Sequence, residues 1–292
     1  YKAPLKKLQG RGYASGFWFN AGGESSAQVN ITEDGNVVVT TGHPDIGGSR
    51  ASIANITAEL LGIDVNRISV LIGDTATIGF SNLTGGSRVL FASALVVTES
   101  TNQVIDILKD RASKIWNIDK EAIEWENGEA RPAGDNAGKF KPLSLVELAE
   151  QATPTGGPIG AGHQVNTVGA EGGFATHICD VEVDIELGIA RVIRYTAAQD
   201  VGKAIHPAYV EGQLQGGVVQ GIGWALNEEY IYNKEGKLDN PGFLDYRIPV
   251  CSDLPMIDTI LVEVPNPQHP QGVRGVGAVS YTHLRAHETS TY

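Results

Sequence analysis

The apolar residues in the first part of the chain follow two different periods. Residues 27–41 alternate apolar and polar side chains on both sides of Asp34-Gly35-Asn36, which is the pattern of a β-hairpin. From Ser49 the apolar positions recur at helical spacing until Gly62, a residue type that commonly follows the last turn of a helix. This region is therefore predicted to form two paired strands and then a helix.

The same two periods continue through the middle of the chain. The apolar run at 68–73 predicts a strand, and after a loop over 74–86 a long helical pattern runs from Ser87 to about residue 116. Residues 123–134 have the composition of a second hairpin, and residues 143–151 predict a short helix.

A stretch rich in Pro and Gly and without periodicity, residues 152–164, predicts a domain boundary. Beyond it, we expect paired strands near 174–184 and 190–198, a helix over 207–226 and further strands up to 264. Because strands and helices are interleaved in this way, the sequence predicts an α+β fold.

The boundary divides the chain into two expected lobes, residues 1–155 and 156–278. A length of 292 residues is sufficient for two domains with cores of their own. The composition is 41% hydrophobic and 19% charged, and no apolar run approaches the roughly 20 residues that a bilayer span needs. We therefore expect a globular α+β protein without a membrane segment.

Charge and cysteine content narrow the expected partners. A net charge of -12 would repel a phosphate backbone, so nucleic acid is not an expected partner. Two cysteines, Cys179 and Cys251, are too few for a disulfide framework or a four-thiolate iron–sulfur site. These features favour a reduced, cytoplasmic setting.

Glycine is abundant, with 36 residues, and it gathers in short runs. Three of these runs, 45–49, 84–88 and 211–217, lie at or inside predicted helix starts, where free backbone N–H groups can bind anions. Such turns would suit a large anionic cofactor. Helix caps and tight turns that serve only the fold are the alternative explanation of each run.

Other chemical signatures are weak. The sequence has neither a phosphate-binding loop of the GxxxxGK[ST] type nor a complete dinucleotide fingerprint. His283 and His287 have the spacing of a zinc-binding helix, but no third ligand lies near them. The other histidines are isolated in different segments and are expected to be structural or solvated; they are His43, His163, His177, His206 and His269. No direct metal ligand is predicted.

Longer motifs resemble a known family. The stretches DGNVVVTTGHPDIGGSRASIANITAELLGI, GDT and TGGSR closely resemble, in order and spacing, the second molybdopterin-binding region of the xanthine dehydrogenase and aldehyde oxidase family of molybdenum hydroxylases. The later stretches GGFATHICDVEVDIELGIARVIRYTAAQDVGKAIHPAYVEGQLQGGVVQGIGWALNEE, GFLDYRIPVCSDLP and VRGVG resemble the C-terminal part of the same large subunits. The resemblance covers roughly residues 10 to 277.

The resemblance implies a cofactor and a reaction. In this family the large subunit binds molybdopterin with molybdenum, commonly as the cytosine dinucleotide in bacteria, and hydroxylates aldehydes or N-heterocycles. It also implies [2Fe-2S] clusters and often FAD on other domains or subunits. The amino-terminal half of the large subunit would be the nearest partner of this chain.

Site residues follow from the resemblance by position. Ile46, Gly47 and Gly48 would approach the pterin or its phosphates, and Gln213 would hydrogen-bond near molybdenum. The residues expected to line the cofactor and substrate side are Gly85, Gly86, Ser87, Arg88 and Val89. Their alternative roles are helix capping and turn formation.

Two departures from the family pattern affect the expected activity. Gly47-Gly48-Ser49 stands where many relatives have Gly-Gln-Gly, which removes a side-chain amide from the cofactor contact. Ala278 stands where the family has the glutamate that acts as base, and a methyl group cannot accept a proton.

The tail 279–292 does not resemble the family and looks like translated adapter sequence, so it is left out of the fold prediction. We expect no catalytic residue in this chain and no turnover by it alone.

Three hypotheses follow for the function. The leading one is the cofactor-binding part of a molybdenum hydroxylase. The alternative from another class is a non-catalytic module for cofactor binding or assembly. A third is a fragment that misfolds because its partner domain no longer covers its apolar surface, which would aggregate in size-exclusion chromatography.

Overall fold

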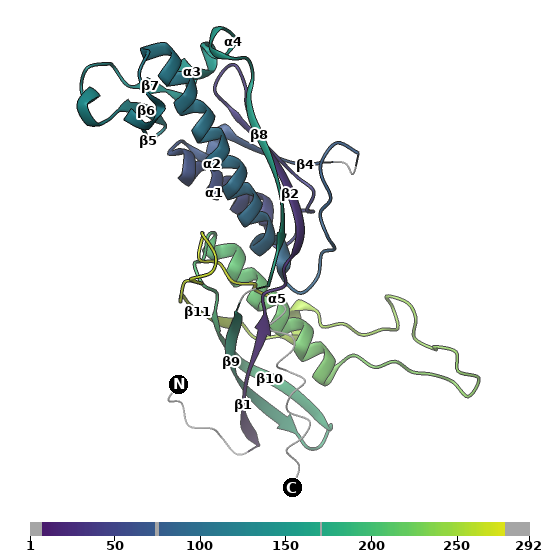
Figure 1. Cartoon of the computed structure of the whole chain (residues 1–292). Helices are drawn as coiled ribbons and strands as arrows, with labels where there is room; N and C mark the ends of the chain where they lie inside the picture. The colour runs from purple at the N-terminus through teal and green to yellow at the C-terminus, as the bar shows by residue number, and fades with distance from the viewer. Residues whose placement is uncertain (1–7, 74–75, 170, 278–292) are drawn as a thin grey trace. The chain divides into compact units, whose positions relative to one another are not determined.

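The computed structural model describes residues 8–73, 76–169 and 171–277, which fall into two compact units (Figure 1). The continuous unit comprises residues 21–169 together with the short segment 267–271. The discontinuous unit comprises residues 8–20, 171–266 and 272–277. Both units contain helices and strands, which confirms the α+β prediction.

The continuous unit is built on a four-stranded sheet with the order β4-β3-β2-β8. Its strands are β2 (Gly23–Ile31), β3 (Val37–Thr41), β4 (Ile68–Ile72) and β8 (Ile159–Thr167). The β2 and β3 strands form the predicted hairpin, whereas β3 and β4 run parallel. Because Thr41 pairs with Ile72, the segments that lead from these two strands into helices leave the sheet at the same end.

Helices α1 (Ser49–Leu61) and α2 (Arg88–Trp116) pack with this sheet around the main core. Aliphatic side chains of all these elements are fully buried, among them Val29, Ile53 and Val97. Each such side chain stabilises the fold by about 1.5–3 kcal/mol relative to its exposed state. The predicted helix end is confirmed, because Gly62 has a φ of 68° and donates its N–H to the carbonyl of Ala58.

A small three-stranded sheet and two short helices follow α2. Ser144 and Glu147 form a capping box at the start of the first of these helices. The elements are β5 (Ile123–Glu126), β6 (Glu129–Pro132), β7 (Leu143–Ser144), α3 (Leu145–Glu150) and α4 (Ala152–Thr155). Short 3₁₀ turns lie at Val65–Arg67, Lys120–Ala122, Gly134–Asn136 and Cys251–Asp253.

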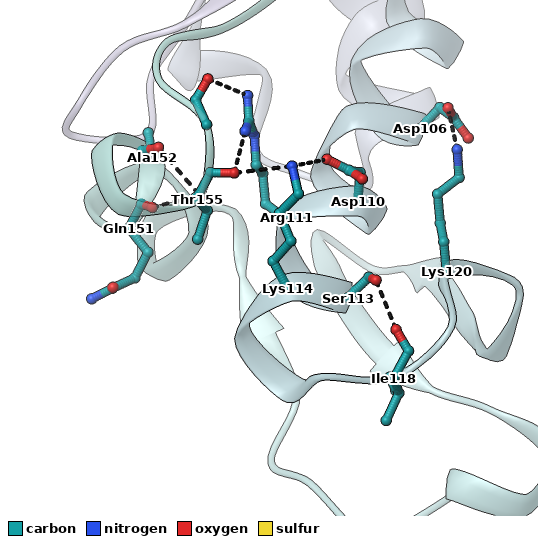
Figure 2. A network of polar contacts seen from close by, with 11 residues as sticks. Asp106, Asp110, Arg111, Ser113, Lys114, Ile118, Lys120, Gln151, Ala152 and Thr155 are labelled. Carbon is teal, nitrogen blue, oxygen red and sulfur yellow. Dashed lines mark hydrogen bonds and ion pairs between the residues drawn. The ribbon is translucent and has the colours of Figure 1, made fainter.

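The carboxyl end of α2 is fastened to α4 by charged side chains (Figure 2). The buried Arg111 donates from Nη1 to the carbonyl oxygen of Thr155 at 2.5 Å and from Nη2 to that of Gly156 at 3.1 Å. Lys114 donates to Asp110 at 2.7 Å and also to the Thr155 carbonyl at 3.1 Å. These carbonyl groups end a short helix, so the cations meet its negative pole.

The discontinuous unit has a four-stranded sheet with the order β1-β9-β10-β11. Helix α5 (Pro207–Leu226) packs on one face of it, where Val218 and Ile222 meet Tyr195 in a second core. The Tyr195 hydroxyl lies 3.0 Å from Nδ1 of the buried His177, so this core includes a polar pair. The strands are β1 (Gln9–Phe19), β9 (Gly172–Asp184), β10 (Ile189–Asp200) and β11 (Ile257–Val262).

These units differ from the predicted division at 155/156 at strand β8, at strand β1 and at the short segment 267–271. Strand β8 lies in the stretch predicted as a boundary, yet it pairs with β2 along its whole length and completes the sheet of the continuous unit. Strand β1 precedes the continuous unit in the chain but pairs with β9 in the discontinuous one.

Between α5 and β11 the described residues form only an isolated bridge, Tyr232 with Leu238, instead of the expected strands. Among the described residues, no helix is long and apolar enough to cross a membrane.

Candidate cofactor-binding site

The first predicted glycine turn forms the amino end of α1. Ile46 donates its N–H to the Pro44 carbonyl at 3.1 Å, and the Ser49 hydroxyl donates to the same oxygen at 3.2 Å. Gly47 and Gly48 then take left-handed backbone conformations, with φ of 61° and 75°. Only glycine adopts such angles without a steric penalty, so the turn depends on this pair of glycines. Ser49 supplies a hydrogen bond that closes the turn.

This turn presents backbone donors that the protein does not use. Within the described part of the chain, neither Gly47 nor Gly48 donates its N–H to a protein acceptor. Their position at a helix amino end favours an anion. The Asp45 carboxylate accepts from the Arg50 N–H at 3.1 Å and would repel an anion, but the Arg50 side chain lies 3.5 Å from it and offsets that charge. The turn can therefore receive an oxyanion at its glycines.

The second predicted turn forms the amino end of α2 in a similar way. Gly86 and Ser87 precede the helix with φ of 63° and 59°, so again two left-handed residues lead into a helix. A Cβ at Gly85 would lie 2.9 Å from the end of the exposed Leu83 side chain, which would have to move to make room. Val89 is buried and belongs to the fold's interior.

Arg88 has a structural role that the sequence did not reveal. Its side chain is 2% exposed, and all five guanidinium N–H groups have protein acceptors. These acceptors are the carbonyl oxygens of Gly22, Glu24, Asn82 and Leu83 and the hydroxyl of Ser25, at 2.6–3.1 Å. The guanidinium thus has no N–H left for a ligand, and it positions the turn. That Arg88 lines the cofactor and substrate side stays a prediction.

A short polar chain brings the two turns together. Arg88 donates to the Ser25 hydroxyl at 3.1 Å, and that oxygen lies 2.9 Å from Nε2 of His43, which directly precedes the first turn. Burial, together with the neighbouring guanidinium, lowers the pKa of His43 to about 4, so the ring is neutral at pH 7. His43 is 1% exposed, in agreement with the structural role expected for it.

Gln213 lies on α5 in the discontinuous unit. The run 211–217 is helical, so its backbone N–H groups serve the helix and only side chains can reach a ligand. The half-buried Gln213 amide has no hydrogen bond to any described residue. On either side of it Gly212 and Gly216 leave open space, because a Cβ at either position would meet no atom within 4 Å. The amide is therefore available for a ligand.

The VRGVG segment is anchored in the same unit. The buried Arg274 contacts Asp200 at 3.0 Å and Glu171 at 3.2 Å, and it donates to the Gly172 carbonyl at 2.9 Å. Gly275 donates its N–H to the side chain of Asn20 at 2.6 Å. Sequence reasoning missed this anchor, although an arginine between apolar residues and glycines was a signal for a buried ion pair. The segment is thus held in place at Arg274 and Gly275.

Several predicted positions lie outside the described residues: Ala278, the tail 279–292, and His283 and His287 within it. Among the described residues, no three His, Cys, Asp or Glu side chains gather closely enough to hold a metal ion. The continuous unit therefore offers the backbone N–H groups of Gly47 and Gly48, which can bind an oxyanion. In the discontinuous unit, the side-chain amide of Gln213 can hydrogen-bond to a polar group.

Comparison with known proteins agrees with these features. A family model described as molybdopterin cofactor-binding domain matches residues 3–255. The carbon monoxide dehydrogenase large chain of Hydrogenophaga pseudoflava is 26% identical over 86% of this chain and 32% of its own length. The xanthine dehydrogenase molybdenum-binding subunit of Escherichia coli O157:H7 is 28% identical over 91% of this chain and 36% of its own length.

Solved structures show the same fold. Quinoline 2-oxidoreductase from Pseudomonas putida 86 superposes with a TM-score of 0.83 at 26% identity and covers 95% of this chain and 38% of its own. The chain thus spans about a third of the length of the relatives it matches. Because the family model covers most of its residues, the chain belongs to the molybdopterin cofactor-binding domain family of the molybdenum hydroxylases.

Proposed function

We propose that this chain forms the second cofactor-binding part of a molybdenum hydroxylase large subunit, and that this subunit hydroxylates an aldehyde or an N-heterocycle. The observation that carries the proposal is the Gly47-Gly48 turn, whose N–H groups have no acceptor among the described residues and lie at the amino end of a 13-residue helix. Family membership supports a molybdopterin phosphate as the anion that this turn binds.

Each predicted contact has a defined task in this proposal. The Gly47 and Gly48 N–H groups bind an oxyanion of the cofactor, and Ile46, half exposed beside them, covers it from solvent. The Gln213 amide donates to a polar atom of the cofactor near the metal. When bound, the cofactor supplies the two-electron redox chemistry, while the residues of this chain bind and orient it. The cytosine dinucleotide is the proposed form.

The whole enzyme needs more than this chain. We propose that the remaining part of the large subunit completes the substrate pocket, and that iron–sulfur and FAD groups lie on other domains or subunits. With alanine at position 278 in place of the family's glutamate, no group of this chain takes the role of the base. Cytoplasmic location is part of the same proposal.

The test uses the complete large subunit that contains this sequence. Its molybdenum content is measured by plasma mass spectrometry, and the nucleotide released on hydrolysis is identified by chromatography. Stoichiometric molybdenum with a cytosine nucleotide supports the proposal, whereas a subunit that contains no molybdenum refutes it. If the Ala278→Glu variant of the complete subunit binds cofactor but oxidises no aldehyde or N-heterocycle, a binding or assembly module is the better description.

A further inference from the structure

Among the described residues, no helix packs on one face of the β1-β9-β10-β11 sheet. Residues paired directly across antiparallel strands point to the same side, and the register pairs Phe17 with Phe174 and Tyr13 with Ile178. The alternate residues of the same strands, such as Ala14 and His177, are buried on the side where α5 packs. The face opposite α5, here called the open face, therefore presents aromatic rings.

These rings are exposed far beyond what isolated surface residues require. Tyr13, Phe17, Phe19 and Phe174 are 56–63% exposed, and Phe17 and Phe174 contact each other with ring centres 6.0 Å apart. On the far strand Ile260 adds a half-exposed aliphatic side chain. At 150 to 250 Å² for a whole aromatic side chain, the four rings present on the order of 500 Å² of apolar surface. Apolar surface of that size is comparable to the largest patch on a typical monomer, and such a patch is often functional.

Polar groups on the open face are largely paired with one another. Arg11 holds Asp180 at 2.7 Å, Arg194 holds Asp258 at 3.1 Å, and the hydroxyls of Ser15 and Thr176 lie 2.8 Å apart. The charged groups of the open face are therefore already neutralised across the strands. An occupant gains little binding energy by bringing charges of its own. It gains by covering the rings, as in permanent interfaces, which are more apolar than transient ones.

We infer that the open face is covered by the part of the large subunit that this chain does not include. The inference rests on the proposed function, because the chain matches only about a third of its relatives' length, and the remaining two thirds are available to cover this face within one polypeptide. The contacting segment supplies aliphatic or aromatic side chains to Phe17 and Phe174. It needs no cationic or anionic patch.

Hydroxyl-radical footprinting with mass spectrometry tests the inference. The oxidation of Tyr13, Phe17 and Phe174 is compared between this chain alone and the complete large subunit, each at two concentrations. Burial in an interface core excludes solvent from a side chain and so lowers its oxidation. The expected result is that these three residues are oxidised less in the complete subunit than in the chain alone, at both concentrations. Ile185 and Leu187, which are 70% and 69% exposed in the β9–β10 turn away from these rings, are the internal controls.

Two outcomes would overturn the inference. Equal oxidation of the rings in the chain and in the complete subunit shows that the face stays open. Protection that already appears in the isolated chain and disappears on dilution shows that a second copy covers it. The variant pair Phe17→Asp with Phe174→Asp should abolish the protection of Tyr13 in the complete subunit, whereas Ile185→Asp with Leu187→Asp should preserve it. Molybdenum content, measured on the same samples, reports on the proposed function independently.

Discussion

The substitution Arg88→Met tests whether one buried arginine holds the two turns together. Methionine keeps much of the length of the side chain but donates no hydrogen bond, so four carbonyl groups and the Ser25 hydroxyl lose their donor at once. Removing one member of a buried charged network costs about 3–5 kcal/mol. For a unit of this size that corresponds to a fall of roughly 10 °C in the melting temperature.

The assay is urea unfolding followed by the fluorescence of Trp116 and Trp125, which both lie in the continuous unit. Arg67→Met is the matched control, because Arg67 lies in the same unit but donates chiefly to the carbonyl of Asp34 on an exposed turn. We expect the control to lose less than about 1 kcal/mol. If Arg88→Met were no more destabilising than Arg67→Met, the assignment of Arg88 as the structural anchor would be refuted.

Three further predictions concern a crowded glycine, the anion-binding turn and the buried histidine. Gly156→Ala should unfold at clearly lower urea than Gly157→Ala, because a Cβ at Gly156 would lie 1.4 Å from a buried guanidinium nitrogen, whereas one at Gly157 meets nothing within 4 Å; equal midpoints would contradict this. Gly47→Ala and Gly134→Ala should each cost about 1–2 kcal/mol in folding, since both glycines have a positive φ, but only Gly47→Ala should lower the molybdenum content of the complete subunit. The pKa of His43 is about 4 in the folded chain against 6.5 in the unfolded chain, so protons bind the unfolded state more tightly and stability falls as the pH drops from about 6.5 to 4. The free energy of unfolding is measured by urea titration at pH 7.5 and at pH 4.0, and His43→Gln should make its fall between these pH values smaller by on the order of 3 kcal/mol. A pH dependence that His43→Gln leaves unchanged would count against a neutral buried ring.

Local periodicity predicted most of the elements correctly. The helices at 49–61, 88–116 and 207–226 agree with the predictions to within a residue or two, because strong apolar spacing and glycine ends define them. The hairpin at 27–41 was equally clear, since a DGN turn fixes its register. In each case the residues that determine the element are close to one another in the sequence.

Long-range pairing was not predictable in the same way. Strand β8 contains two glycines and follows a Pro- and Gly-rich stretch, so it looks like a linker, yet it is held by backbone pairing with β2, about 130 residues earlier. The anchoring roles of Arg88 and Arg274 depend on carbonyl and carboxylate partners that only the fold brings near. Sequence motifs did indicate the Gly47 and Gly86 turns, but not that Ser25 and His43 link them.

The pairing of β1 with β9 also determines the order in which the chain can fold. Phe19 is opposite Gly172, so some 150 intervening residues leave and return at one point of a sheet. During synthesis the continuous unit has nearly all of its sequence as soon as β8 has emerged, and its contacts can form early. Strand β1 is synthesised before the continuous unit and stays unpaired until β9 has been made, and its sheet is completed only after β11. An aromatic edge strand held open for that long is a ready point for chaperone binding during translation.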